Sequence, residues 1–106
     1  MNLKYKIEFA QLDWTTPGDH IRYKCYQHDG FQVRLVEFGK NMIHPDWCFK
    51  GHFGYIVEGK LELTFSGVTE VYERGDAIFI PNGDEHKHRP KVLSDKVVFF
   101  SVEKIE

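Results

Sequence analysis

The chain has 106 residues, the length of one domain, which excludes a TIM barrel and a separate cofactor-binding domain. Its formal charge of −2 and pI of about 6.3 give no basic surface for nucleic acid or an anionic membrane. Nine valines, seven isoleucines and sixteen aromatic residues stand against six leucines and two alanines. β-Branched and aromatic side chains suit strands, so the composition predicts a small all-β protein.

Turn-forming residues divide the chain into short runs rich in Val, Ile, Phe and Tyr. Asp29-Gly30 predicts a hairpin turn between the first two runs, and no window longer than about ten residues has helical apolar spacing. Short antiparallel strands of this kind favour a jelly-roll or double-sheet barrel, since the Cys…Trp…Cys pattern of an immunoglobulin-like sandwich is missing. The predicted strands are residues 21–27, 31–38, 52–57, 61–65, 68–73, 77–80, 86–89 and 97–102.

These strands predict one domain over residues 1–106, with an N-terminal segment of about residues 1–20 followed by the barrel over 21–106. The run 52–57 has apolar side chains on both faces, with Phe53, Tyr55 and Val57 on one and Ile56 on the other. We therefore expect this strand to be covered on both sides, by the N-terminal segment or by a second subunit. A homodimer is the expected assembly.

The sequence favours a cytoplasmic location. Its N-terminus alternates charged and apolar residues and lacks the apolar run of a signal peptide, and no stretch reaches the roughly 18 apolar residues of a membrane span. The two cysteines, Cys25 and Cys48, form no CxxC pair, and free thiols are usual in the cytosol. The expected partners are a small molecule and a second copy of the chain.

Six histidines are placed unevenly along the chain, and some have other metal-binding residue types nearby. His44, Asp46, Cys48 and His52 are all at even positions, so they would share one face if this segment were extended. Pro45 makes a continuous strand there doubtful. Imidazole, thiolate and carboxylate groups bind Zn, Fe, Ni or Mn, so this segment is a candidate metal site.

A second candidate lies near the C-terminus. His86 and His88 are two residues apart and would share a strand face. His86, like His52, lies against apolar strand residues, whereas Lys87 and Arg89 on either side of His88 favour a solvated position for that side chain. His86 is therefore the stronger candidate of this pair.

Residues 75–86 resemble the second motif of the cupin family, G-x5-P-x-G-x2-H. Gly75, Pro81, Gly83 and His86 occupy its fixed positions, and Pro90 replaces the asparagine that can follow. The resemblance implies a double-stranded β-helix, or jelly-roll barrel, in which the turn at Pro81 and Gly83 aims His86 inward.

The first cupin motif, H-x-H-x3-E-x6-G, is represented by its final glycine, Gly59. Counting back from Gly59, its Glu position falls on His52 and its two His positions fall on Cys48 and Asp46. The resemblance therefore implies a divalent-metal site (Zn, Fe, Ni or Mn) formed by Asp46, Cys48, His52 and His86. This set differs from the three-His, one-Glu set usual in the family, so no reaction is carried across with it.

Three functions are consistent with these residues. The first is a metal-dependent cupin, an enzyme or a sensor, that acts on a small polar molecule. The second is a metal-free module that binds a small ligand at the barrel mouth through His52, His86 and Trp47. The third uses Cys48 as a reactive thiol beside His52. The sequence names no substrate and leaves open whether the protein is an enzyme.

Overall fold

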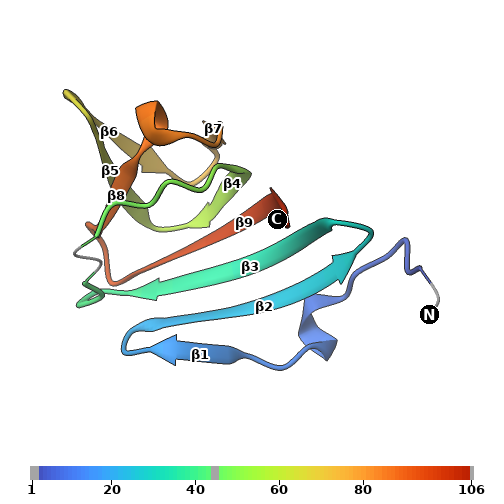
Figure 1. Ribbon diagram of the computed structural model, residues 1–106. Helices are drawn as coiled ribbons and strands as arrows, with labels where there is room; N and C mark the ends of the chain where they lie inside the picture. The colour runs from blue at the N-terminus through green and yellow to red at the C-terminus, as the bar shows by residue number, and fades with distance from the viewer. Residues whose placement is uncertain (1–2, 44–45, 106) are drawn as a thin grey trace.

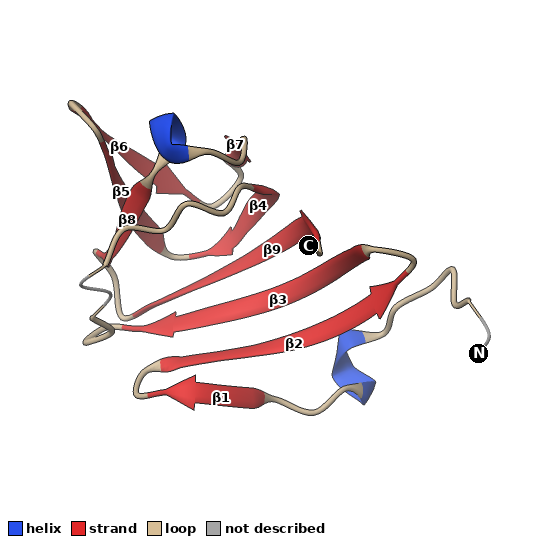
Figure 2. Ribbon diagram, viewed as in Figure 1, coloured by secondary structure: helices blue, strands red, loops and turns tan. Residues whose placement is uncertain are grey.

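The computed structural model describes residues 3–43 and 46–105. Within these residues it contains strands, two single-turn 3-10 helices and no α-helix (Figures 1 and 2). No helix in the described part of the chain is long and apolar enough to cross a membrane. The helical turns are η1 (Phe9–Gln11) and η2 (Asp84–His86), and the strands are β1 (Thr15–Gly18), β2 (Ile21–His28), β3 (Phe31–Gly39), β4 (His52–Glu58), β5 (Lys60–Phe65), β6 (Val68–Glu73), β7 (Ala77–Ile80), β8 (His88–Val92) and β9 (Lys96–Lys104).

The strands form two antiparallel sheets. The larger has the order β1-β2-β3-β9-β4-β7, and the smaller has the order β6-β5-β8. Figure 1 shows the smaller sheet over one end of the larger one, so that β2 and β3 extend beyond it. The predicted all-β double-sheet barrel is thereby confirmed.

Most strand predictions are confirmed within one or two residues, and the Asp29-Gly30 hairpin forms with both residues at positive φ. The predicted strand 86–89 is wrong at its start. Gly83, at φ 129°, leads into η2, which occupies Asp84–His86, and β8 begins only at His88. β1 lies inside the segment expected to precede the barrel and pairs with β2 at the sheet edge.

The core lies between the two sheets and follows the alternation of the strands. In β4 and β9, Ile56 and Val97 are fully buried, and in β5 Leu61 and Leu63 are buried while Glu62 and Thr64 alternate with them. The same inward face of β9 continues past Val97 to two polar residues, Ser101 and Glu103, which are also buried. This change from apolar to polar side chains marks the end of the barrel where the candidate site lies.

The outer face of the larger sheet is apolar around β4 and β7. Phe53 and Phe79 are paired across these strands with ring centroids 4.9 Å apart, and Phe79 is 78% exposed. The N-terminal segment reaches the neighbouring strand, where the Phe9 ring packs edge-on against Phe100 of β9. It leaves the outer face of β4 exposed in the single chain.

Candidate metal centre

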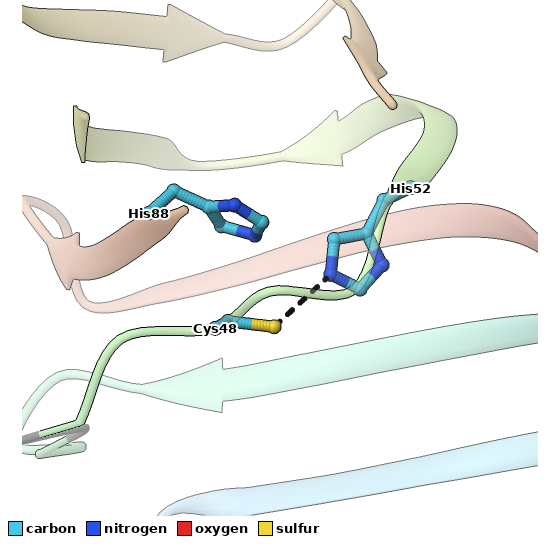
Figure 3. A group of neighbouring side chains, drawn as sticks. All are labelled: Cys48, His52 and His88. Atoms are coloured by element: carbon cyan, nitrogen blue, oxygen red, sulfur yellow. Dashed lines mark hydrogen bonds between the residues drawn. The ribbon is translucent and has the colours of Figure 1, made fainter. Parts of the chain in front are cut away.

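Three metal-binding side chains meet between the sheets. Cys48 precedes β4, His52 begins β4 in the larger sheet, and His88 begins β8 in the smaller one. One donor atom from each lies within 4.8 Å of the others, and Cys48 Sγ is 3.9 Å from His52 Nε2. Figure 3 shows the thiol and both imidazole rings pointing toward a common point.

Backbone hydrogen bonds fix the segment that carries Cys48. The Cys48 N–H donates to the His88 carbonyl at 2.8 Å, and the His88 N–H donates to the Cys48 carbonyl at 3.0 Å. The Gly51 N–H donates to Asn82 Oδ1 at 2.5 Å, and a Cβ at Gly51 would overlap the Ile80 carbonyl oxygen. Because residue 51 is a glycine, this segment can pass close to the backbone at the end of β7. Its Cys48 then lies beside the first residue of β8.

Hydrogen bonds orient both imidazoles. His52 Nδ1 lies 2.7 Å from Glu103 Oε2, and His88 Nδ1 lies 3.0 Å from the His86 carbonyl oxygen. In the neutral ring, an Nδ1–H that donates to an oxygen leaves Nε2 with a free lone pair. Both rings can therefore present Nε2 as a ligand atom, and the His52 Nε2 already faces the Cys48 sulfur.

Glu103 is only 3% exposed and lies at the centre of a polar network. Burial raises the pKa of its carboxyl, but the His52 imidazole and the Arg34 guanidinium together lower it well below its usual range. Glu103 is therefore a carboxylate that holds His52 in place. Besides His52, its oxygens face Gln32 Nε2 at 2.6 Å, Ser101 Oγ at 2.8 Å, Arg34 Nη2 at 2.9 Å and Lys50 Nζ at 3.6 Å.

The Cys48 thiol is strongly acidic. The imidazoles of His52 and His88 lower its pKa from 9.0 to about 5, against the opposing effect of burial. Burial lowers the pKa of His52, but its hydrogen bonds with Cys48 and Glu103 outweigh burial and raise that pKa. At neutral pH the site therefore contains a thiolate, which is the form of cysteine that binds metals.

The three side chains form part of the wall of a cavity of about 220 Å³ between the sheets. Most of the lining is apolar, including Val36 and Phe38 of β3 and Leu63 of β5. Its polar side chains belong to Tyr23, Arg34, Cys48, His52 and His88. The thiolate and imidazoles thus face a partly open, mainly apolar space large enough for a small molecule.

The structure brings together only two of the four residues of the expected metal set. It brings Cys48 and His52 together, with His88 as the third member of the group. His86 lies in η2, half-buried and outside this group, and supplies its carbonyl oxygen to His88. Asp46 is exposed and also outside the group. The earlier candidate His44 lies outside the described residues.

The expectation that His88 is solvated is wrong, because this side chain is 3% exposed. Its charged neighbours in the sequence favour exposure, whereas pairing with Phe65 of β5 and the bridge to Cys48, forty residues earlier in the chain, fix its buried position. Sequence reasoning also missed Glu103 and Arg34. Glu103 has a signal in the sequence, since the alternation Val97, Phe99, Ser101 places it on the inward face once the strand is extended to Lys104.

The donor set fits a divalent metal. A thiolate and two neutral imidazoles are ligands of zinc and of other first-row transition metals. In a tetrahedral zinc site, such ligand atoms lie about 3.3–3.6 Å from one another, as follows from the usual Zn–S and Zn–N bond lengths. The 3.9 Å between Cys48 Sγ and His52 Nε2 is close to this value. Glu103 and the His86 carbonyl supply the outer hydrogen bonds that metal-binding histidines usually make.

Comparisons with solved structures support the fold. KdgF from Halomonas sp. is 22% identical, with 92% of each chain covered and a TM-score of 0.72. An RmlC-like cupin from Shewanella frigidimarina NCIMB 400 is 17% identical over 98% of this chain and 93% of that chain, with a TM-score of 0.74. The polyketide cyclase RemF from Streptomyces resistomycificus is 22% identical over 98% of this chain and 81% of that chain, with a TM-score of 0.79. At these identities the likeness concerns the fold alone.

No curated protein matches the sequence. Residues 35–102 match the family described as the cupin domain, and this region contains both motifs and all three donor side chains. Because the match spans well over half of the 106 residues, the chain belongs to the cupin family.

Proposed function

We propose that this cupin binds one divalent metal ion through Cys48, His52 and His88 and uses it to bind or transform a small molecule in the adjoining cavity. The observation that carries the proposal is the convergence of three donor atoms within 4.8 Å on the wall of that cavity. Three protein ligands leave a coordination position for a water or a bound molecule, as in catalytic rather than structural zinc sites.

The protein's own groups support this role. The Glu103 carboxylate keeps the His52 Nδ1–H engaged, and the His86 carbonyl does the same for His88, so both rings are held before any ion arrives. The low pKa of Cys48 keeps its thiolate available at neutral pH. When bound, the metal would supply Lewis acidity toward an oxygen of the small molecule.

The donor types favour Zn, Fe or Ni over Mn, because thiolate and imidazole are softer than the carboxylate and water ligands that Mn prefers. Of the four metals that the sequence allows, Zn, Fe and Ni therefore remain the favoured ones. Asp46 and His86 are not needed as ligands in this proposal, since the three donors already meet without them.

Thiol chemistry is a second candidate. Cys48 has an acidic thiol, His52 lies 3.9 Å from its sulfur, and Glu103 orients His52 at 2.7 Å. A nucleophile, a base and an orienting carboxylate are the groups of a cysteine-based catalytic site. The expectation of metal-free ligand binding is also consistent with the apolar cavity.

Metal analysis of untagged protein tests the proposal. We expect close to one equivalent of a transition metal per chain, and losses of at least about tenfold in metal affinity in Cys48→Ser and His88→Ala, which each remove one ligand. Cys25→Ser and His86→Ala are the matched controls, since neither residue belongs to the group of donors. Less than a tenth of an equivalent in the parent protein after growth with added metals would refute metal binding.

We also propose that the protein is a homodimer. The exposed apolar side chains of β4 and β7, which include Phe53, Tyr55 and Phe79, would be covered by the same face of a second copy. In this dimer, the second copy would cover the outer apolar face of β4, which the sequence predicts to be covered on both faces.

A further inference from the structure

Arg34 is a permanently charged side chain in the wall of the apolar cavity. Its Nη2 donates to Glu103 Oε2 at 2.9 Å, and its guanidinium carbon lies 5.1 Å from the centroid of the Tyr23 ring. Its Nε is buried and has no hydrogen-bond partner among the described residues. A buried N–H without an acceptor is unfavourable, so the guanidinium at the cavity wall has donor capacity that no described residue satisfies.

Arg34 is close to the metal centre. The same oxygen of Glu103 lies 2.9 Å from Arg34 Nη2 and 2.7 Å from His52 Nδ1, so the guanidinium and the imidazole share one partner atom. Arg34 also lines a groove of about 490 Å³ next to the cavity, together with Thr15, Tyr23, Cys25, Tyr26, Gln27 and Gln32. The arginine therefore lies where an apolar space, a polar groove and the three donors come together.

The cavity sets the size and polarity of what can bind. An apolar cavity of about 150 Å³ is large enough to hold benzene. At about 220 Å³, this cavity has room for one six-membered ring with a short chain, and its lining is mostly apolar. A nucleotide or a free sugar does not suit it, because such ligands need many more polar partners than this wall offers.

We infer that the cavity takes a small carboxylic acid, with an apolar body about the size of one ring and a carboxylate that accepts a hydrogen bond from the Arg34 guanidinium. The inference rests on the proposed function, since it takes the cavity beside Cys48, His52 and His88 as the binding site. Arginine is suited to carboxylates because its planar donors match their geometry.

Charge also favours a monoanion. The Arg34 guanidinium and the Glu103 carboxylate neutralise each other, and Lys50 adds a positive charge near the same carboxylate. A divalent ion held by a single thiolate and two neutral imidazoles would leave further positive charge. An anionic ligand compensates this excess, whereas a neutral analogue does not.

Isothermal titration calorimetry with 3-phenylpropionate and its amide, 3-phenylpropionamide, tests the inference. The two probes share the same apolar body and differ in charge. We expect the acid to bind at least about tenfold more tightly than the amide, as for other charge-assisted hydrogen bonds. Arg34→Gln should remove this preference and Arg34→Lys should retain part of it. Arg22→Gln is the matched control, because Arg22 pairs with Glu37 away from the cavity and should leave the preference unchanged.

Equal affinities for acid and amide, or no binding of either, would overturn the inference, as would an unchanged preference in Arg34→Gln. The comparison of the two probes uses the native chain, so it stands even if the Arg34 variants fold poorly. Repeating it after metal removal separates the two proposals. An acid preference that persists after metal removal supports the inference independently of the metal site. A metal-loaded protein that binds both probes equally overturns the inference and leaves the metal site standing.

Discussion

Glu103 Oε2 lies 2.7 Å from His52 Nδ1, and this contact connects the last strand of the barrel to the first residue of β4. The carboxylate is almost fully buried and would be unstable there without the cations and donors around it. It therefore has two roles. It orients a candidate metal ligand, and it neutralises Arg34 inside the protein.

Glu103→Gln should affect both stability and metal affinity. The substitution leaves the Arg34 guanidinium without its buried counter-ion, which should cost about 3 kcal/mol in the free energy of unfolding measured with urea. Metal affinity should fall by about 10- to 100-fold, because the His52 ring loses its charged acceptor. Glu37→Gln breaks a more exposed pair with Arg22 and should cost less than about 1 kcal/mol. Equal effects of the two variants would contradict this view of Glu103.

The reactivity of Cys48 should persist to low pH in metal-free protein. In a Cys25→Ser background only Cys48 reacts, and its alkylation by iodoacetamide should fall to half near pH 5, where its thiolate becomes protonated. The folded pKa lies below the unfolded value of 9.0, so this thiol contributes stability above pH 9 that is lost as the pH falls toward 5. A midpoint between pH 8 and 9 in the folded protein would show that His52 and His88 do not stabilise the thiolate.

Gly54→Ala should strongly destabilise the protein. Gly54 lies in β4 opposite Ser101, and a Cβ there would overlap the carbonyl oxygen of Phe100 in β9. Because both groups belong to paired strands, the clash is with backbone, and we expect a loss of at least about 2 kcal/mol in the free energy of unfolding. Gly18→Ala is the control, since its nearest atom, Ile21 Cγ2, would be at an ordinary 3.7 Å. Thermal unfolding of the two variants compares them directly.

Phe79→Asp should disrupt the proposed dimer. Light scattering of the parent chain should give twice the 12.5 kDa of one subunit, and a charge on this exposed ring should weaken association by at least about tenfold. Val68→Asp changes an exposed apolar residue of the smaller sheet and should leave the mass unchanged. A parent mass of 12–13 kDa at micromolar concentration would refute the dimer.

The sequence predicts most of the fold because the strands alternate clearly. Leu61 and Leu63 are buried while Glu62 lies between them, as their spacing indicates. The sequence does not predict β1, because the Pro and Gly that end its Thr-Thr-Pro-Gly segment are depleted in strands. It forms at the edge of the sheet, where the missing N–H of Pro17 is tolerated.

The candidate site was only partly predictable. The register of the first motif puts Cys48 and His52 in one set, and the structure places these two side chains together, since both are close to β4 in the chain. The position of His88 depends on the turn at Gly83 and on a bridge to Cys48 between distant segments. Neither follows from local alternation, and the network of Arg34 and Glu103 likewise depends on which strands become neighbours.

His52 belongs to the larger sheet and His88 to the smaller one, with Cys48 bridged to His88. An ion held by all three would thus act as a removable cross-link between the two halves of the barrel. The opening motions that admit a molecule to the interior would then be slower in the loaded protein than in the empty one. Amide hydrogen exchange along β5 and β8 would report that difference, so metal content could control the rate of ligand entry as well as its chemistry.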